Sequence, residues 1–339
     1  MRHLAPLLCA ANATTEDKRA KPHVLILRNK FYARDSRQPS TEEMHLDNTL
    51  SASGLATFEA LTYDHDLLIS PLADLQLIRK CESEKPAVVI LSSWGEAPRH
   101  PSIASLRYIR RELKIPVVSI WWDTCNTKFW KDVQSIVAEI DCHVVVDNPR
   151  RLLADALENE NDSFLWLWVP EDSSLYSAGG GKDIPVSFLG QASAYRAYRS
   201  EFVDHLISSG IAGYFSTADR HSQVSHREYA SILRRSLMSI NLSYSVSCHQ
   251  LKSRVFEIML SGSLLLESEN PQISALFEPM THYVPFSSKQ DLCDKVRHYI
   301  AHPEEARQIA KNGLDRAASC YNGDLFWRMV LNKVGVAVP

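Results

Sequence analysis

Basic side chains stand at the start of one predicted helix, which we expect over about residues 252–261. Lys252 and Arg254 lie in its first turn, and Glu257 follows one turn later. Basic groups at a helix start oppose the helix dipole, but together with the free backbone N–H groups they could hold a phosphate. The alternative is an exposed ion pair between Arg254 and Glu257, worth a few tenths of a kcal/mol. The residues alone favour the two interpretations equally.

The apolar face of this helix fixes where its acid should point. Spacing assigns Phe256, Met259, Leu260 and Ser263 to the buried face, so Glu257 is expected to lie off it. The helix should end at Gly262, and an apolar strand over 263–267 follows.

Continuous apolar strands alternate with helices through most of the chain, which predicts parallel sheets covered on both faces. The expected strands are 23–28, 86–92, 115–122, 141–147, 184–189, 238–242 and 263–267. The expected helices are 44–53, 103–113, 196–209, 229–237, 252–261, 289–301, 303–320 and 325–333. The predicted fold class is therefore α/β, with two Rossmann-like domains facing across a cleft.

Glycine-rich turn material between 162 and 185 divides this pattern into two halves. We expect a flexible leader at 1–20, an N-terminal domain at 21–165, a linker at 166–183 and a C-terminal domain at 184–320. A final helix within 321–339 could pack back on the N-terminal domain. The first residues faintly resemble a secretory signal, but Pro6 breaks a short apolar stretch, so a disordered tail is favoured.

Composition excludes several classes of protein. Lys and Arg number 37 against 40 Asp and Glu, and a net charge of −3 argues against general affinity for nucleic acid or anionic membranes. No apolar run approaches the roughly 18 residues of a transmembrane helix. The seven cysteines form no C-x-x-C pair, which favours a reducing, cytoplasmic setting without zinc. The sequence carries no signal of oligomeric state.

The segment around the basic helix has a recognisable order: Arg254, then Phe256-Glu257, then Ser261-Gly262, then the apolar strand. Over residues 229–327 it resembles the donor-binding half of group 1 glycosyltransferases with the GT-B fold. It is most similar to their spore-maturation-type (CgeB-like) branch. The pattern continues with Phe277-Glu278-Pro279, Val284-Pro285-Phe286, Asp291-Leu292 and 302–307. The N-terminal half matches in organisation only.

The resemblance implies a set of residues that bind the donor, a nucleotide-diphosphate sugar. Glu257 would accept hydrogen bonds from the ribose hydroxyls. Arg196, in the loop after Gly190, would stabilise the departing diphosphate with Lys252 and Arg254 beside it. Arg199 is the weaker candidate, because a solvated helix residue is the more common role. Many relatives have a second Glu where this chain has His249, eight positions before Glu257, and His249 could contact the sugar or cap the helix.

Strand ends of the N-terminal half would supply the acceptor side and any catalytic base. Trp122 and Asp123 follow a strand, where the ring could stack on a sugar and the carboxylate could act as the base. They could equally be a core anchor and a helix cap. His45 and His100 are weaker candidates. Asp64-His65-Asp66 mimics the metal motif of a different glycosyltransferase fold and is interpreted as a turn, so no metal site is expected.

The expected function is glycosyl transfer from a nucleotide-diphosphate sugar to an acceptor hydroxyl, with retention of configuration. The resemblance implies a hexosyltransferase-like, metal-independent enzyme of polysaccharide or glycoconjugate biosynthesis, whose acceptor is a sugar, a lipid-linked group or a protein. A non-catalytic nucleotide- or sugar-binding module and a nucleotide-sugar epimerase of the same fold are the alternatives.

Overall fold

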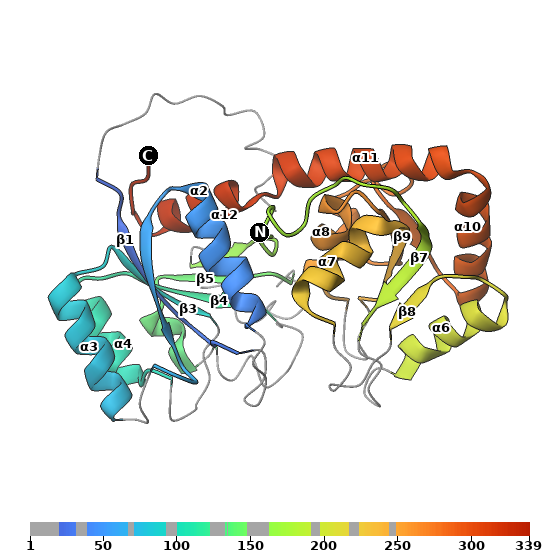
Figure 1. Ribbon diagram of the computed structural model, residues 1–339. Coiled ribbons are helices and arrows are strands. Elements are labelled where there is room, and N and C mark those ends of the chain that lie inside the picture. Colours follow the sequence, from blue (N-terminus) through green and yellow to red (C-terminus); the bar gives the residue numbers. More distant parts are fainter. Residues whose placement is uncertain are drawn as a thin grey trace. The chain divides into compact units, whose positions relative to one another are not determined.

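Two compact units make up the chain. The computed structural model describes residues 20–31, 39–66, 71–92, 100–122, 133, 135–147, 163–190, 197–216, 224–243 and 249–339. Unit 1 comprises Met1–Asp172 and Tyr321–Pro339, and unit 2 comprises Ser173–Cys320 (Figure 1). The expected leader at 1–20 lies outside the described residues except for its last residue. Unit 1 is thus built from two stretches of chain separated by the whole of unit 2.

Unit 1 contains a parallel sheet of six strands in the order β2-β1-β3-β4-β5-β6. Every residue of β3, β4 and β5 is buried, as expected for inner strands covered on both faces. The strands are β1 (His23–Arg28), β2 (Thr57–Thr62), β3 (Val88–Ser92), β4 (Val117–Trp121), β5 (Cys142–Val145) and β6 (Phe164–Trp166).

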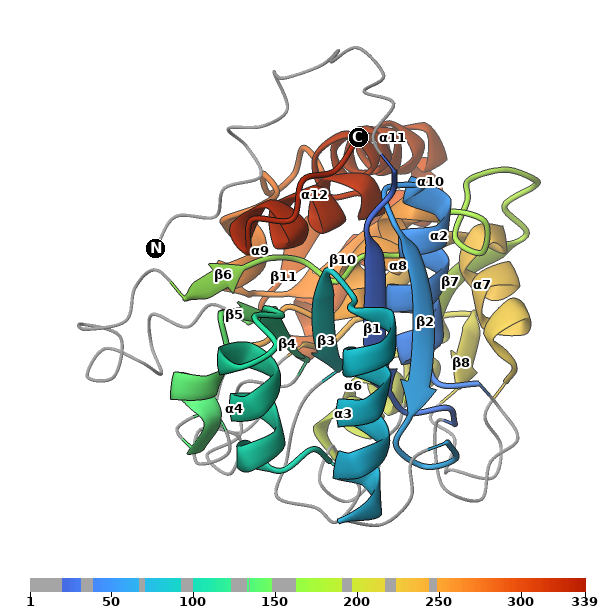
Figure 2. The same cartoon turned by 90° about the vertical axis from the view of Figure 1, so that its left-hand side faces the viewer.

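Helices cover both faces of this sheet. Figures 1 and 2 show α3 (Leu72–Glu84) and α4 (Ile103–Arg111) on one side, with α2 (Thr49–Ser53) and α12 (Gly323–Lys333) on the other. A π-helix, η1 (Glu43–Asn48), leads directly into α2, and a 3-10 turn, η2 (Val137–Glu139), precedes β5. Gly54 ends α2 in the left-handed conformation, at a φ of 64°.

Unit 2 contains a second parallel sheet, of five strands in the order β11-β10-β9-β7-β8. The strands are β7 (Ile184–Leu189), β8 (Tyr214–Ser216), β9 (Ser236–Asn241), β10 (Leu264–Ser268) and β11 (Val284–Phe286). The helices are α6 (Ala197–Ser208), α7 (His226–Arg235), α8 (Ser253–Leu260), α9 (Pro271–Ser274), α10 (Lys289–Ala301) and α11 (Pro303–Cys320).

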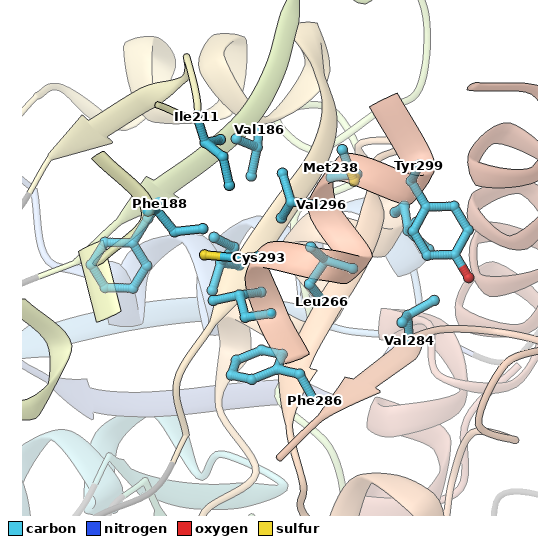
Figure 3. Packing of buried hydrophobic residues seen from close by; sticks show 14 of the residues in the cluster. Val186, Phe188, Ile211, Met238, Leu266, Val284, Phe286, Cys293, Val296 and Tyr299 are labelled. Carbon is cyan, nitrogen blue, oxygen red and sulfur yellow. The ribbon is translucent and has the colours of Figure 1, made fainter. Parts of the chain in front are cut away.

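The core of unit 2 lies between its strands and the helices α6 and α10. Figure 3 shows Phe188 and Met238 from the strands packed near Cys293 and Val296 of α10. Figure 1 shows α7 and α8 on the other side of the strands. Five consecutive residues of α8 are buried, so this helix is enclosed on most sides. That enclosure explains why Glu257 is buried, against the expectation from spacing.

The α/β fold class is confirmed. The helix expected at 44–53 is present as η1 and α2, with its first part π-helical. The structure also contains elements that the sequence did not predict, namely β2, β6, β8, β11, α3, α9 and η2. The division between the units falls after Asp172, inside the stretch expected to be a linker. That stretch holds buried side chains such as Trp168 and Tyr176.

Cysteine pairing and hydropathy bear on the setting of the protein. Cys81, Cys142 and Cys293 are buried free thiols. Cys320 is disulfide-bonded, which the expectation of a reducing compartment did not include. Among the described residues, no helix has both the length and the apolar character needed to cross a membrane.

Candidate functional site

The carboxyl edge of the unit 2 sheet gathers the polar residues that the sequence singled out. All strands of this sheet are parallel, so their carboxyl ends meet at one edge, where open α/β sheets bind ligands. Gly190 follows β7, Asn241 ends β9, and Glu267 lies near the end of β10. Arg254 lies in the first turn of α8, next to these strand ends.

Tyr229 of α7 joins the two charged residues of α8. Its hydroxyl donates to Oε2 of Glu257 at 2.6 Å and accepts from Nε of Arg254 at 3.1 Å. Burial, reinforced by the negative charge of Glu257, raises the pKa of Tyr229 far above its usual value, so it stays a phenol. Glu257 is only 7% exposed and also accepts from the Tyr176 hydroxyl at 3.4 Å. The alternative of an exposed Arg254–Glu257 ion pair is therefore wrong.

Gly190 leaves room for the Arg254 guanidinium. A Cβ at position 190 would lie 3.4 Å from Nη1 of Arg254 and 2.9 Å from the buried ring of Phe188. The same Nη1 donates to Oδ1 of Asn241 at 3.4 Å. The guanidinium is thus held across the ends of β7 and β9, where the backbone carries no side chain at Gly190. A half-buried cation in this place suits an anionic group such as a diphosphate.

For the other predicted donor residues, the structure gives no hydrogen bond or ion pair with Arg254, Tyr229 or Glu257 among the described residues. Lys252 is the residue before α8, in extended conformation, and Arg199 of α6 is buried, where its Nη2 donates to the Leu242 carbonyl at 2.9 Å. Arg199 is therefore not a solvated surface residue. The backbone carbonyl of His249 accepts from the Gln272 side chain. Arg196 lies outside the described residues.

In unit 1, two of the predicted acceptor-side residues lie together. The ring centroids of Trp122 and His45 are 5.7 Å apart, and Trp122 Nε1 donates to the Ser92 hydroxyl at 2.8 Å. Nδ1 of His45 lies 3.1 Å from the Pro170 carbonyl and 3.3 Å from a carboxylate oxygen of Glu171.

The other two acceptor-side candidates are His100 and Asp123. The His100 ring lies 4.3 Å from that of Tyr63. Asp123, the predicted base, lies outside the described residues.

Several polar residues of these sites were missed by sequence reasoning. Glu42 of unit 1 accepts from the Asn29 backbone N–H at 2.6 Å and from the Ser92 hydroxyl, and burial raises its pKa. In unit 2 the missed residues are Tyr229, Asn241 and Glu267. A polar residue that closes an apolar strand, as Asn241 does, was the available signal.

One group in the described part of unit 1 has the spacing of a metal site. His23, Glu59 and Glu84 converge near the first strands, but the Lys80 ammonium lies 2.8 Å from Glu59 and 2.6 Å from Glu84. A lysine therefore already neutralises these carboxylates. Asp64 accepts the backbone N–H groups of Lys30 and Phe31, which confirms that Asp64-His65-Asp66 is a turn.

Comparisons with known proteins agree with this architecture. Anabaena HepE in complex with UDP-glucose superposes with a TM-score of 0.63 and 10% identity, covering 93% of this chain and 100% of that one. Sucrose-phosphate synthase from Thermosynechococcus elongatus gives a TM-score of 0.62 and 10% identity over 93% and 99% of the two chains. The fold is GT-B.

The family match covers most of unit 2. Residues 183–324 match a family model described as glycosyl transferase-like. Human protein O-glucosyltransferase 3 is 28% identical over 114 residues, which are 32% of this chain and 22% of that protein. The chain thus spans about a fifth of the length of the curated relatives it matches. The family match supports a glycosyltransferase-like unit 2, and neither match names the spore-maturation-type branch.

Proposed function

We propose that the protein is a glycosyltransferase whose unit 2 binds a nucleoside-diphosphate sugar. The observation that carries the proposal is the guanidinium of Arg254 over Gly190, coupled through Tyr229 to the buried Glu257. These residues lie within the stretch that matches the glycosyl transferase-like family. HepE, of the same fold, was crystallised with UDP-glucose, which supports a donor of this class.

The chemistry that this arrangement would perform is departure of a nucleoside diphosphate. As the bond from the anomeric carbon to the phosphate oxygen breaks, negative charge grows on the diphosphate. The acceptor hydroxyl forms the new bond to that carbon, and its proton passes to the departing diphosphate. Arg254 would stabilise that charge more in the transition state than in the ground state. Glu257 would accept from the ribose diol and so fix the nucleotide. Arg196, Lys252, Arg199 and His249 stay candidates for the same donor.

The proposal assigns the acceptor to unit 1. The Trp122 ring, held by Ser92 and His45, offers an aromatic surface for a sugar, and Glu42 is a half-buried acid beside Ser92. We propose hexosyl transfer with retention and without a metal ion, to a sugar, a lipid-linked group or a protein. The cytoplasm is the proposed location.

Nucleotide binding by two variants tests the donor site. Glu257→Gln should weaken UDP and uridine alike, each about tenfold or more, because both contain the ribose. Arg254→Met should weaken UDP at least tenfold and uridine little, because uridine has no phosphate. Isothermal calorimetry with UDP, ADP, GDP and their nucleosides measures both effects.

The matched control is Glu201→Gln, which alters an exposed glutamate paired with Lys289 on the same unit. It should bind every nucleotide as the wild-type protein does. Unchanged affinity of Glu257→Gln for all of the nucleotides would remove Glu257 from the donor site. UDP-glucose turnover in the presence of acceptor sugars then separates transfer from binding alone.

A further inference from the structure

Glu267 is a fully buried acid that the proposed reaction does not use directly. It lies in β10, opposite Pro285 of β11, and is 0% exposed. Its oxygen Oε2 accepts from Nδ2 of Asn241 at 2.7 Å, and Oε1 accepts from the Ser243 backbone N–H at 3.3 Å and the Ser268 hydroxyl at 3.1 Å. Burying an acid is costly, so its hydrogen bonds indicate what it is there to hold.

The contacts of Glu267 decide which way the Asn241 side chain faces. Nδ2 of Asn241 donates to Glu267 and also to the Ser243 hydroxyl at 2.8 Å, which uses both of its hydrogens. Oδ1 therefore points to the other side, where it accepts from Nη1 of Arg254 at 3.4 Å. If the amide turned over, its N–H groups would face the N–H groups of the guanidinium. An acceptor at position 267 prevents that turn.

We propose that Glu267 is a positioning residue for the donor site, which holds the Asn241 amide so that its oxygen keeps the Arg254 guanidinium over Gly190. The inference rests on the proposed function, because Arg254 is there assigned to the diphosphate. It adds that a residue with no contact to the donor sets the affinity for its phosphate part.

The protonation state of Glu267 gives the proposed role a consequence that can be measured in solution, namely a pH dependence of diphosphate affinity. Burial raises the pKa of Glu267 to about 8, although its hydrogen bonds from Asn241 and Ser243 oppose the shift. In the neutral form its proton can lie on Oε1 and be donated to the Ser268 hydroxyl, so Oε2 still accepts from Asn241. A neutral acid holds the amide without cancelling the charge of Arg254.

The charged groups around Glu267 are few in the described part of unit 2. Arg254 faces it from α8, and Tyr283, which precedes β11 and also faces Glu269, lies near it. Helix α11 also packs against β10, and its buried residues carry no charged side chain: they are Ala306, Ala310, Gly313, Ala317 and Cys320. A diphosphate bound at Arg254 would raise the pKa of Glu267 further, so by linkage its affinity should fall as the pH rises through about 8.

Two substitutions of Glu267 test the proposal by calorimetry with UDP and uridine. Glu267→Leu removes the acceptor, and we expect about a tenfold loss of UDP affinity at pH 7 with uridine affinity within about twofold. Glu267→Gln keeps a carbonyl oxygen for Asn241, and we expect UDP affinity within about twofold of wild type at pH 7. Between pH 7 and pH 9 the wild-type affinity should fall severalfold, whereas that of Glu267→Gln should stay flat.

A double variant and a control separate positioning from general damage. In an Arg254→Met background, Glu267→Leu should cost no further UDP affinity, because it acts through the missing guanidinium. Ser268→Ala removes one contact of Glu267 but none of Asn241, and should bind UDP as wild type does. Burial lowers the pKa of Lys182 to about 8, close to that of Glu267. Lys182 is present in every variant, so any effect of its titration on UDP affinity cancels when the variants are compared.

Several results would overturn the proposal. They are a folded Glu267→Leu with wild-type UDP affinity, equal losses for UDP and uridine, additive losses with Arg254→Met, or a pH-dependent fall that persists in Glu267→Gln. If Glu267→Leu does not fold, the pH profile of Glu267→Gln against wild type decides alone. A wild-type protein that binds none of UDP, ADP and GDP overturns the proposed function, and this inference falls with it.

Discussion

At the scale of single residues, the Tyr229 hydroxyl touches both charged groups of α8 that were named from the sequence. Tyr229→Phe would leave Glu257 and Arg254 in place without the group between them. We expect the free energy of unfolding to fall by about 1–3 kcal/mol, since a partly buried hydrogen bond to a charged group is lost. Urea denaturation at pH 7 measures the change.

Tyr108→Phe is the matched control for this prediction. Its hydroxyl also donates to a glutamate, Glu82, at 2.9 Å, but the pair is exposed on unit 1. Water replaces such a bond, so the unfolding free energy should barely change. Equal losses in the two variants would mean that the hydroxyl of Tyr229 gains nothing from its buried position between two charges.

The sequence could name Arg254, Glu257 and Gly190 because each stands in a local pattern. It could not name Tyr229, Asn241 or Glu267 as their partners, because these come from different elements and meet only once the sheet has formed. The burial of Glu257 was missed for a related reason: periodicity describes one apolar face, whereas α8 is enclosed by α7, α11 and the strands.

At the scale of elements, Lys182 ties the stretch before β7 to the ends of two helices. Its ammonium donates to the Arg234 carbonyl at the end of α7 at 2.8 Å, and to the Ser261 carbonyl after α8 at 3.3 Å. These carbonyls lack partners within their helices, and a cation suits them. Burial, with the nearby charge of Arg234, lowers the pKa of Lys182 to about 8.

This lowered pKa predicts how stability changes with pH. The unfolded lysine keeps its proton up to about pH 10.4, whereas the folded one loses it near pH 8, so the unfolded state binds more protons between these values. The unfolding free energy should therefore rise with pH in that window, by about 1 kcal/mol per pH unit relative to Lys182→Met. Urea denaturation at pH 8, 9 and 10 gives the slope.

Lys289→Met, which alters an exposed lysine paired with Glu201, provides the comparison. Its stability should follow the wild-type curve at each pH. Parallel curves for wild type and Lys182→Met would show that the folded lysine keeps its proton and that the linkage is absent.

Elements with a continuous apolar run could be predicted from the sequence, and short edge elements could not. β1 and β7 lie where their apolar runs stand, and α10 and α11 agree at both ends with the expected ranges. In contrast β2 is an edge strand with a half-buried, mixed sequence, and β8 and β11 have three residues each. Their conformation depends on pairing with β1, β7 and β10, which no local pattern contains.

At the scale of the whole molecule, the last helix belongs to the first unit. Trp327 of α12 is fully buried, and its Nε1 donates to the Thr49 hydroxyl of α2 at 2.9 Å. Gly323 permits this approach, because a Cβ there would lie 3.0 Å from Thr49. Unit 1 therefore completes its fold with residues that follow unit 2 in the chain, whereas unit 2 is continuous.

Trp327→Ala tests whether α12 stabilises unit 1 without affecting the donor site of unit 2. Loss of the buried ring should destabilise unit 1 by about 3–5 kcal/mol, which lowers its melting temperature in scanning calorimetry, because a cavity remains. The Thr49 hydroxyl loses its Trp327 donor but still donates to the His45 carbonyl. UDP affinity at 10 °C should stay within about twofold of wild type, since every residue assigned to the donor lies in unit 2. Ile300→Ala, on the surface of α10, should change neither quantity by much. A Trp327→Ala protein that melts as wild type does would show that α12 does not stabilise unit 1. Loss of UDP binding while unit 2 stays folded would show that the donor site depends on α12, and it would also contradict this assignment.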